Sequence, residues 1–315
     1  MNLKPFKELR IIFMGTPEFA VASLDKLVQA GCNIVGVITA PDKQAGRGMQ
    51  LQQSAIKKYA VEKGLHILQP EKLKNVDFLA MLAMLNADVQ VVVAFRMLPE
   101  VVWNMPPMGT INVHGSLLPQ YRGAAPINWA VINGEEYTGV TTFKLQQEID
   151  TGNILLSDKL KIESTDTAGT LHDKLKELGA NLLLKTIQGI AEKSIKEQSQ
   201  VLTFNFEPST LKHAPKLFTE TGKINWAKSV DDVYNLIRGL SPYPAAYTNF
   251  NGKKLKFFLV EKITEQPNIE IGSYKTDNKN YLQFACNNGY INVLELQLEG
   301  KKRIDVKDFL RGYRF

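Results

Sequence analysis

Two polar residues in a glycine- and proline-rich segment are suited to catalysis. Residues 109–126 read GTINVHGSLLPQYRGAAP and include Asn112 and His114, whose side chains share one side of an extended backbone. An asparagine amide can donate to a developing oxyanion, and a histidine can transfer a proton near neutral pH. Taken alone, the pair also fits a capping asparagine and a structural histidine. The catalytic interpretation places a reacting centre at the carboxyl end of a strand, where open α/β sheets bind ligands.

A carboxylate follows another expected strand. Asp150 lies in the sequence EIDTG, residues 148–152. A carboxylate that reaches an imidazole orients it and favours its protonated form. The same sequence is also typical of a turn in which the aspartate bonds its own backbone, so Asp150 by itself fits either role.

Several classes of chemistry lack their sequence signatures. The chain has no G-x-G-x-x-G or Walker motif, no G-x-S-x-G elbow and no Cys/His cluster with zinc-ligand spacing, so we expect no metal. Cys32 and Cys286 make no disulfide framework, which fits a reducing, cytoplasmic compartment. We also expect no membrane span, because no apolar run reaches 18 residues.

The elements that must position these residues alternate between strand and helix. Residues 10–14, 33–39 and 88–95 read as strands separated by helical patterns. This alternation predicts the α/β class with a doubly wound, mostly parallel sheet. The end of the chain instead shows short strand-like runs, which suggest a small barrel or sandwich. We therefore expect a catalytic domain over 1–189, a linker over 190–207 and a C-terminal domain over 208–315.

The net charge of +6 is confined to the last third of the chain. Residues 1–207 hold 21 Lys and Arg against 21 Asp and Glu, whereas residues 208–315 hold 17 against 11. A basic domain beside a neutral one suggests a polyanionic partner, although a lysine-rich solvated surface gives the same composition.

The chain resembles the methionyl-tRNA formyltransferases, a family of folate-dependent formyltransferases, over nearly its whole length. The matching stretches are RIIFMGTPEFA (10–20), APDKQAGRG (40–48), INVHGSLLPQYRGAAPI (111–127), TGVT (138–141), EIDTG (148–152), HAPK (213–216), INW (224–226), IRGLSPYPAA (237–246) and EGKKRIDVKDFLRGYR (299–314). The core around residues 111–127 is shared with other folate-dependent formyltransferases. The tRNA-specific interpretation therefore rests on the loop at 40–48 and the basic C-terminal domain.

The resemblance implies a fold, an activity and a set of site residues. The fold would be a Rossmann-like domain followed by a smaller β-barrel of oligonucleotide-binding type. The activity would be formyl transfer from 10-formyltetrahydrofolate to the free amine of methionyl-initiator tRNA, by a cytoplasmic monomer without a metal. The implied residues are Asn112, His114 and Asp150 for catalysis, Ser116, Leu117, Leu118 and Pro119 for folate, and Lys43 and Arg47 for tRNA.

One departure and three alternatives accompany this interpretation. Arg96 stands where relatives usually have glycine, which places a large cation near the expected folate slot. The alternatives are a formyltransferase acting on a sugar-nucleotide amine, a hydrolase that releases formate, and a non-catalytic tRNA-binding protein on an enzyme scaffold. A sugar-amine enzyme would have less need of a basic C-terminal domain.

Overall fold

The computed structural model describes residues 4–45, 50–200 and 210–313, and contacts between residues divide the chain into two units. Unit 1 contains Met1–Arg122, Gly139–Leu160 and Asp173–Lys212, and unit 2 contains Gly123–Thr138, Lys161–His172 and His213–Phe315. This division follows packing and assigns two short internal segments to unit 2. The domain ranges expected from the sequence stay a prediction.

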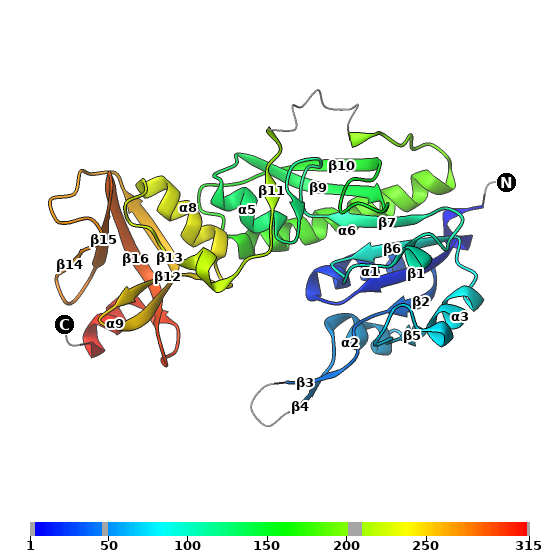
Figure 1. Ribbon diagram of the computed structural model, residues 1–315, viewed down its shortest axis with the longest axis horizontal. Helices are drawn as coiled ribbons and strands as arrows, with labels where there is room; N and C mark the ends of the chain where they lie inside the picture. Colours follow the sequence, from blue (N-terminus) through cyan, green and yellow to red (C-terminus); the bar gives the residue numbers. More distant parts are fainter. Residues whose placement is uncertain (1–3, 46–49, 201–209, 314–315) are drawn as a thin grey trace. The chain divides into compact units, whose positions relative to one another are not determined.

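A sheet of seven strands, counted within the described residues, forms the centre of unit 1 (Figure 1). Its spatial order is β10 (Ile154–Lys161), β9 (Tyr137–Lys144), β7 (Thr110–His114), β6 (Val89–Val93), β1 (Arg10–Gly15), β2 (Asn33–Ile38) and β5 (Ile67–Leu68). The strands from β7 to β5 pair in parallel, and β9 runs antiparallel to β7. All residues of β6 are buried, as expected for a parallel strand covered on both faces.

Helices cover this sheet because its strands carry apolar side chains on both faces. Ile12 and Met14 of β1 share a buried cluster with Phe78 and Leu82 of α3 (Val76–Met84). Helix α1 (Glu18–Gln29) packs against β1 and β6. A Cβ built on Gly179 of α6 (Ala168–Ala191) would lie 3.2 Å from Val113 of β7, so this helix approaches the sheet closely. The expected α/β class with a mostly parallel sheet is confirmed.

The remaining described elements of the first half are short. A hairpin of β3 (Lys43–Ala45) and β4 (Gln50–Gln52) leaves the sheet after β2 (Figure 1). The other elements are η1 (Phe6–Glu8), α2 (Ala55–Glu62), α4 (Glu100–Trp103), β8 (Arg122–Gly123) and α5 (Pro126–Ile132).

Unit 2 is built around an antiparallel sheet with the character of a half-barrel. The strands are β12 (Ala246–Phe250), β13 (Lys253–Ile263), β16 (Gly289–Leu298), β15 (Leu282–Cys286) and β14 (Tyr274–Thr276) in spatial order, and β17 (Ile304–Asp305) pairs with β16. The helical and bridging elements are β11 (His213–Ala214), η3 (Thr219–Gly222), α8 (Val230–Leu240) and α9 (Val306–Gly312). Their core includes Trp226 stacked on Phe284 at 4.9 Å. The expected small β fold at the end of the chain is confirmed.

Candidate active site

Strand β7 presents Asn112 and His114 from the same side, as the sequence predicts. The strand pairs with β6 on one side and with β9 on the other. Asn112 lies opposite Val92 of β6, and His114 lies opposite Thr141 of β9. This pairing fixes the backbone on both sides. His114 retains 7% of its exposure, and Asn112 is half-buried. Within the described residues the Asn112 amide makes no side-chain hydrogen bond, so its two donors are available to a ligand.

His114 is held between a backbone carbonyl and a carboxylate. Its Nε2 lies 2.9 Å from the carbonyl oxygen of Tyr121, and its Nδ1 lies 3.8 Å from Oδ2 of Asp150. Phe143 meets the imidazole edge-on, with 6.4 Å between ring centroids. Asp150 retains 9% of its exposure, so the carboxylate is withdrawn from solvent beside the imidazole. The structure thus brings Asp150 to His114, and Asn112 lies two positions before His114 on the same strand.

The turn that carries Asp150 has an unusual backbone. Asp150 has a φ of 55°, in the left-handed region that non-glycine residues adopt rarely. Two residues later, a Cβ on Gly152 would stand 1.7 Å from the carbonyl oxygen of Lys144. The glycine therefore lets the turn lie directly against the end of β9, which brings Asp150 toward His114.

Two further side chains support this turn and were not found from the sequence. Gln200 donates to the carbonyls of Asp150 and Gly152, at 2.9 and 2.8 Å. Its Oε1 accepts from Nε and Nη2 of Arg122, at 3.1 and 2.6 Å. Desolvation lowers the pKa of Arg122, while the nearby carboxylate of Asp150 opposes this shift. Gln200 lies in the segment that the sequence assigns to a linker, where no local pattern marks it.

The residues implied to contact folate form a buried turn after β7. The Ser116 hydroxyl donates to the Gln120 carbonyl at 2.6 Å, and its own carbonyl accepts from Thr141 at 2.7 Å. Leu118 and Pro119 are buried and joined by a cis peptide bond, whereas Leu117 is half-buried. The turn is thus fixed by internal bonds, and Leu117 is its most accessible side chain.

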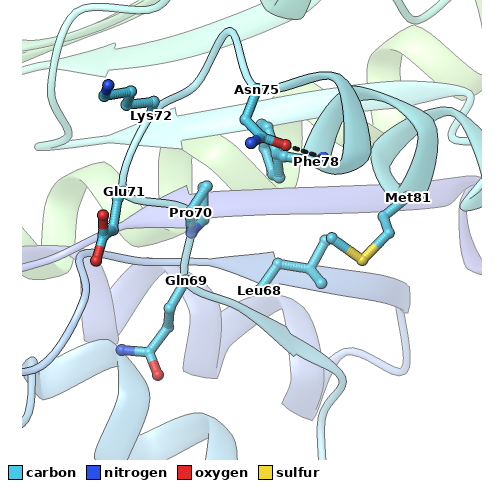
Figure 2. A pocket seen from close by; sticks show the side chains of 8 residues that line it. All are labelled: Leu68, Gln69, Pro70, Glu71, Lys72, Asn75, Phe78 and Met81. Carbon is cyan, nitrogen blue, oxygen red and sulfur yellow. Dashed lines mark hydrogen bonds between the residues drawn. The ribbon is translucent and has the colours of Figure 1, made fainter.

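A cavity of about 470 Å³ lies elsewhere in unit 1, after β5 (Figure 2). Its lining runs from Leu68 and Gln69 through Pro70 and Glu71 to the start of α3. Four strand positions separate β5 from β7, which is roughly 19 Å at about 4.8 Å per strand. The cavity is therefore distinct from the reacting centre around His114.

Arg96 is bonded to the rim of this cavity. Its guanidinium donates to the carbonyl of Glu71 at 2.7 Å and to that of Pro70, and it lies over the Phe95 ring. The side chain is exposed. The guanidinium of Arg96 is thus anchored on the turn after β5.

The base of the β3–β4 hairpin is tied to neighbouring elements. Lys57 of α2 donates to Asp42 at 2.5 Å, and Gln69 donates to both Asp42 and the Ala40 carbonyl at 2.8 Å. The hydrogen bonds from Lys57 and Gln69 hold the pKa of Asp42 below its ordinary value. Lys43 is exposed on β3, whereas Arg47 lies outside the described residues.

This arrangement suits acyl transfer to a nucleophile. A neutral amide donor, an imidazole and a carboxylate lie at the carboxyl end of the parallel strands. There, negative charge on an oxygen can be stabilised and a proton accepted. Among residues 4–45, 50–200 and 210–313, no group of three or more His, Cys, Asp or Glu side chains could hold a metal ion. No helix in the same ranges is long and apolar enough to cross a membrane.

Comparisons with known proteins agree in family and fold. A formyl transferase family matches residues 9–187, and a formyl transferase C-terminal domain matches residues 216–314. Methionyl-tRNA formyltransferases of Bacteroides thetaiotaomicron and Phocaeicola vulgatus are 51% and 55% identical, each over 98% of this chain and 97% of the relative.

Among solved structures, the sugar 3N-formyl transferase WlaRD, crystallised with dTDP and 5-N-formyl-THF, gives a TM-score of 0.68 at 21% identity over 93% of this chain and 99% of that one. HypX from Aquifex aeolicus in complex with tetrahydrofolic acid gives a TM-score of 0.65 at 16% identity over 96% of this chain and 48% of that one. These two structures support the fold alone. The two domain matches and the identity above 50% over almost the whole chain show that it belongs to the methionyl-tRNA formyltransferase family.

Proposed function

We propose that this protein transfers a formyl group from 10-formyltetrahydrofolate to the free amino group of methionyl-initiator tRNA. The main support for the proposal is that Asn112, His114 and Asp150 lie together at the carboxyl end of strand β7 in a member of this family. The distant sugar formyltransferase structures share the fold, but no feature of this site favours a sugar amine.

Each of the three residues has a defined task in this reaction. As the uncharged amine attacks the formyl carbon, negative charge develops on the formyl oxygen, which the Asn112 amide and the nearby imidazole of His114 would stabilise. Asp150 would keep His114 oriented and receive the proton that the amine loses, directly or through a water molecule. The folate nitrogen then leaves with the electron pair of the broken C–N bond and takes up the proton held by Asp150, directly or through water, while the amine keeps the formyl group.

The formyl donor would lie beside the turn at residues 116–119. The unpartnered amide of Asn112 and the accessible Leu117 supply one polar and one apolar contact next to the reacting centre. Ser116 and Thr141 fix the turn internally, which keeps such a slot preformed. We assign Ser116, Leu117, Leu118 and Pro119 to folate binding on this basis.

The tRNA would contact both units through phosphates. The β3–β4 hairpin follows β2, so it begins at the carboxyl end of the sheet, where the reacting centre also lies. Its base is anchored by Asp42, and it carries Lys43; Arg47 lies outside the described residues and follows Lys43 by four positions in the sequence. The excess of positive charge in residues 208–315 suits a polyanion without sequence preference. The family implies that the enzyme acts as a cytoplasmic monomer, which we retain as part of the proposal.

A direct assay tests this function. The purified chain is incubated with 10-formyltetrahydrofolate and charged initiator tRNA, and formylmethionine is measured after deacylation. Free methionine, a sugar-nucleotide amine and water are the competing acceptors in parallel reactions. Formylation confined to the charged tRNA supports the proposal. Preferred formylation of the sugar amine, or formate release without transfer, would overturn it.

A further inference from the structure

Gln200 links the turn of Asp150 to the half-buried Arg122 through four hydrogen bonds. Its amide nitrogen carries two N–H donors, and these reach the carbonyls of Asp150 and Gly152. Its amide oxygen accepts both bonds from the Arg122 guanidinium. Since an amide side chain has two donors and two acceptor lone pairs, every bonding function of Gln200 is used. We call this arrangement the Arg122–Gln200 bridge.

The bridge is buried, so its bonds are costly to lose. Gln200 retains 3% of its exposure, and Arg122 is half-buried. Removing one partner from a buried hydrogen bond leaves the other unsatisfied, which costs more than the bond itself contributes. The bonds from the charged guanidinium also fix the amide orientation, because only the oxygen can accept them.

The turn at Asp150 needs support because its backbone is strained. A non-glycine residue in the left-handed region is sterically disfavoured, because its Cβ crowds the backbone. Gln200 bonds the carbonyls on either side of Thr151, so it spans the strained step. If this support is removed, rotation about the Asp150 backbone moves the carboxylate away from His114, which it meets at only 3.8 Å.

We propose that Gln200 and Arg122 are positioning residues, which hold the Asp150 turn so that its carboxylate faces the imidazole of His114. The inference rests on the proposed function, because it assumes that Asp150 takes part in catalysis. Neither side chain needs to touch the substrate. Both act through the backbone of the turn, so their loss should lower kcat and leave substrate binding nearly unchanged.

Three variants test the bridge. Gln200→Leu removes both sets of hydrogen bonds at similar volume, and Arg122→Lys keeps the charge but loses the two-pronged donor. Gln198→Leu is the matched control, because Gln198 is exposed in the same segment and pairs with Ile154 only through its backbone. A misplacement of about 1 Å can cost about 10²-fold in rate. We expect kcat to fall about 10²-fold in Gln200→Leu and about tenfold in Arg122→Lys, with both KM values within about threefold.

A second experiment, carried out in the Asp150→Asn variant, distinguishes a positioning role of Gln200 from general support of the fold. Residues that act as one unit lose activity non-additively. In Asp150→Asn protein, adding Gln200→Leu should therefore lower the residual kcat by less than about threefold. A full 10²-fold further loss, or an equal loss in Gln198→Leu, would overturn the inference. If Gln200→Leu unfolds below the assay temperature, Arg122→Lys decides the matter, and an unchanged kcat there also overturns it.

The same experiments distinguish a failure of this inference from a failure of the proposed function. If Asp150→Asn keeps full activity, the catalytic assignment of Asp150 fails. If Asp150→Asn is inactive while Gln200→Leu retains full kcat, only the bridge inference fails.

Discussion

The Nε2 atom of His114 lies 2.9 Å from the backbone carbonyl of Tyr121. A carbonyl can only accept, so Nε2 must carry a proton and donate it. The other ring nitrogen, Nδ1, is the one that faces Asp150. Tyr121 has a φ of 61°, a left-handed conformation that helps aim its carbonyl back at the ring. The ring nitrogen of His114 that carries this proton is thus set by a backbone group seven residues away.

Replacing His114 or Asn112 should remove most activity without unfolding the protein. Loss of one preorganised oxyanion donor typically costs about 10²–10³-fold in rate. We expect His114→Ala and Asn112→Ala to lower kcat for formyl transfer by at least that factor, measured in single turnovers. The control is His66→Ala, which removes an exposed histidine. A His114→Ala protein with wild-type turnover would refute the mechanism.

Gly152→Ala should destabilise the protein. The added Cβ would stand 1.7 Å from the Lys144 carbonyl oxygen, so the backbone of the turn must move. We expect a loss of about 3 kcal/mol or more in the free energy of unfolding, with loss of activity. Gly312→Ala is the control, because a Cβ there meets nothing within 4 Å. Denaturant unfolding measures both, and equal stability of the two variants would contradict the close approach seen at Gly152.

The two cysteines should resist thiol reagents in the folded protein. Burial raises the pKa of Cys286 to about 12 and that of Cys32 to about 11, where Lys7 partly opposes the shift. The thiolate, which is the reactive form, should then be on the order of 10⁻³ of Cys32 at pH 8 and less of Cys286. Labelling should be slow and rise about tenfold per pH unit below these pKa values. Rapid reaction of both thiols at pH 8 before unfolding would show this to be wrong.

Removing an unpaired lysine from unit 2 should weaken tRNA binding in a salt-dependent way. Lys301 is exposed and has no charged partner within the described residues, whereas Lys262 is 2.5 Å from Asp231. Removal of one lysine–phosphate interaction should reduce the slope of log K against log salt by about 1. Lys301→Ala should show this change, and Lys262→Ala should show less. The measurement is a binding titration at several salt concentrations, and identical slopes in all proteins would argue against an interaction of Lys301 with phosphate.

Arg47→Ala should impair the reaction with tRNA and spare the formyl donor. An arginine can bind a phosphate with two parallel hydrogen bonds, so its loss removes positioning as well as charge. We expect kcat/KM for charged tRNA to fall by about tenfold or more, with folate binding unchanged. The control is Lys63→Ala, which removes an exposed lysine paired with Glu62. Equal loss of folate binding would instead place Arg47 in the folate site.

Local patterns in the sequence determined most of the elements. The expected strands at residues 10–14, 33–39 and 88–95 correspond to β1, β2 and β6, and the short strand-like runs expected at the end of the chain form the antiparallel sheet of unit 2. Side-chain alternation also predicted that Asn112 and His114 would share a face of β7. These features follow from periodicity over a few residues, which the chain carries directly.

Only the tertiary structure decided how the site is completed. Asp150 meets an imidazole 36 positions away in the chain because Gly152 lets its turn lie against β9, and Gln200 reaches that turn from 50 positions away. No local sequence pattern marks Gln200 or the Tyr121 carbonyl. A polar residue in a polar segment gives the same pattern whether or not it belongs to a functional site. Their roles depend on which backbone groups long-range packing leaves within hydrogen-bond distance, and no short stretch of sequence contains that information.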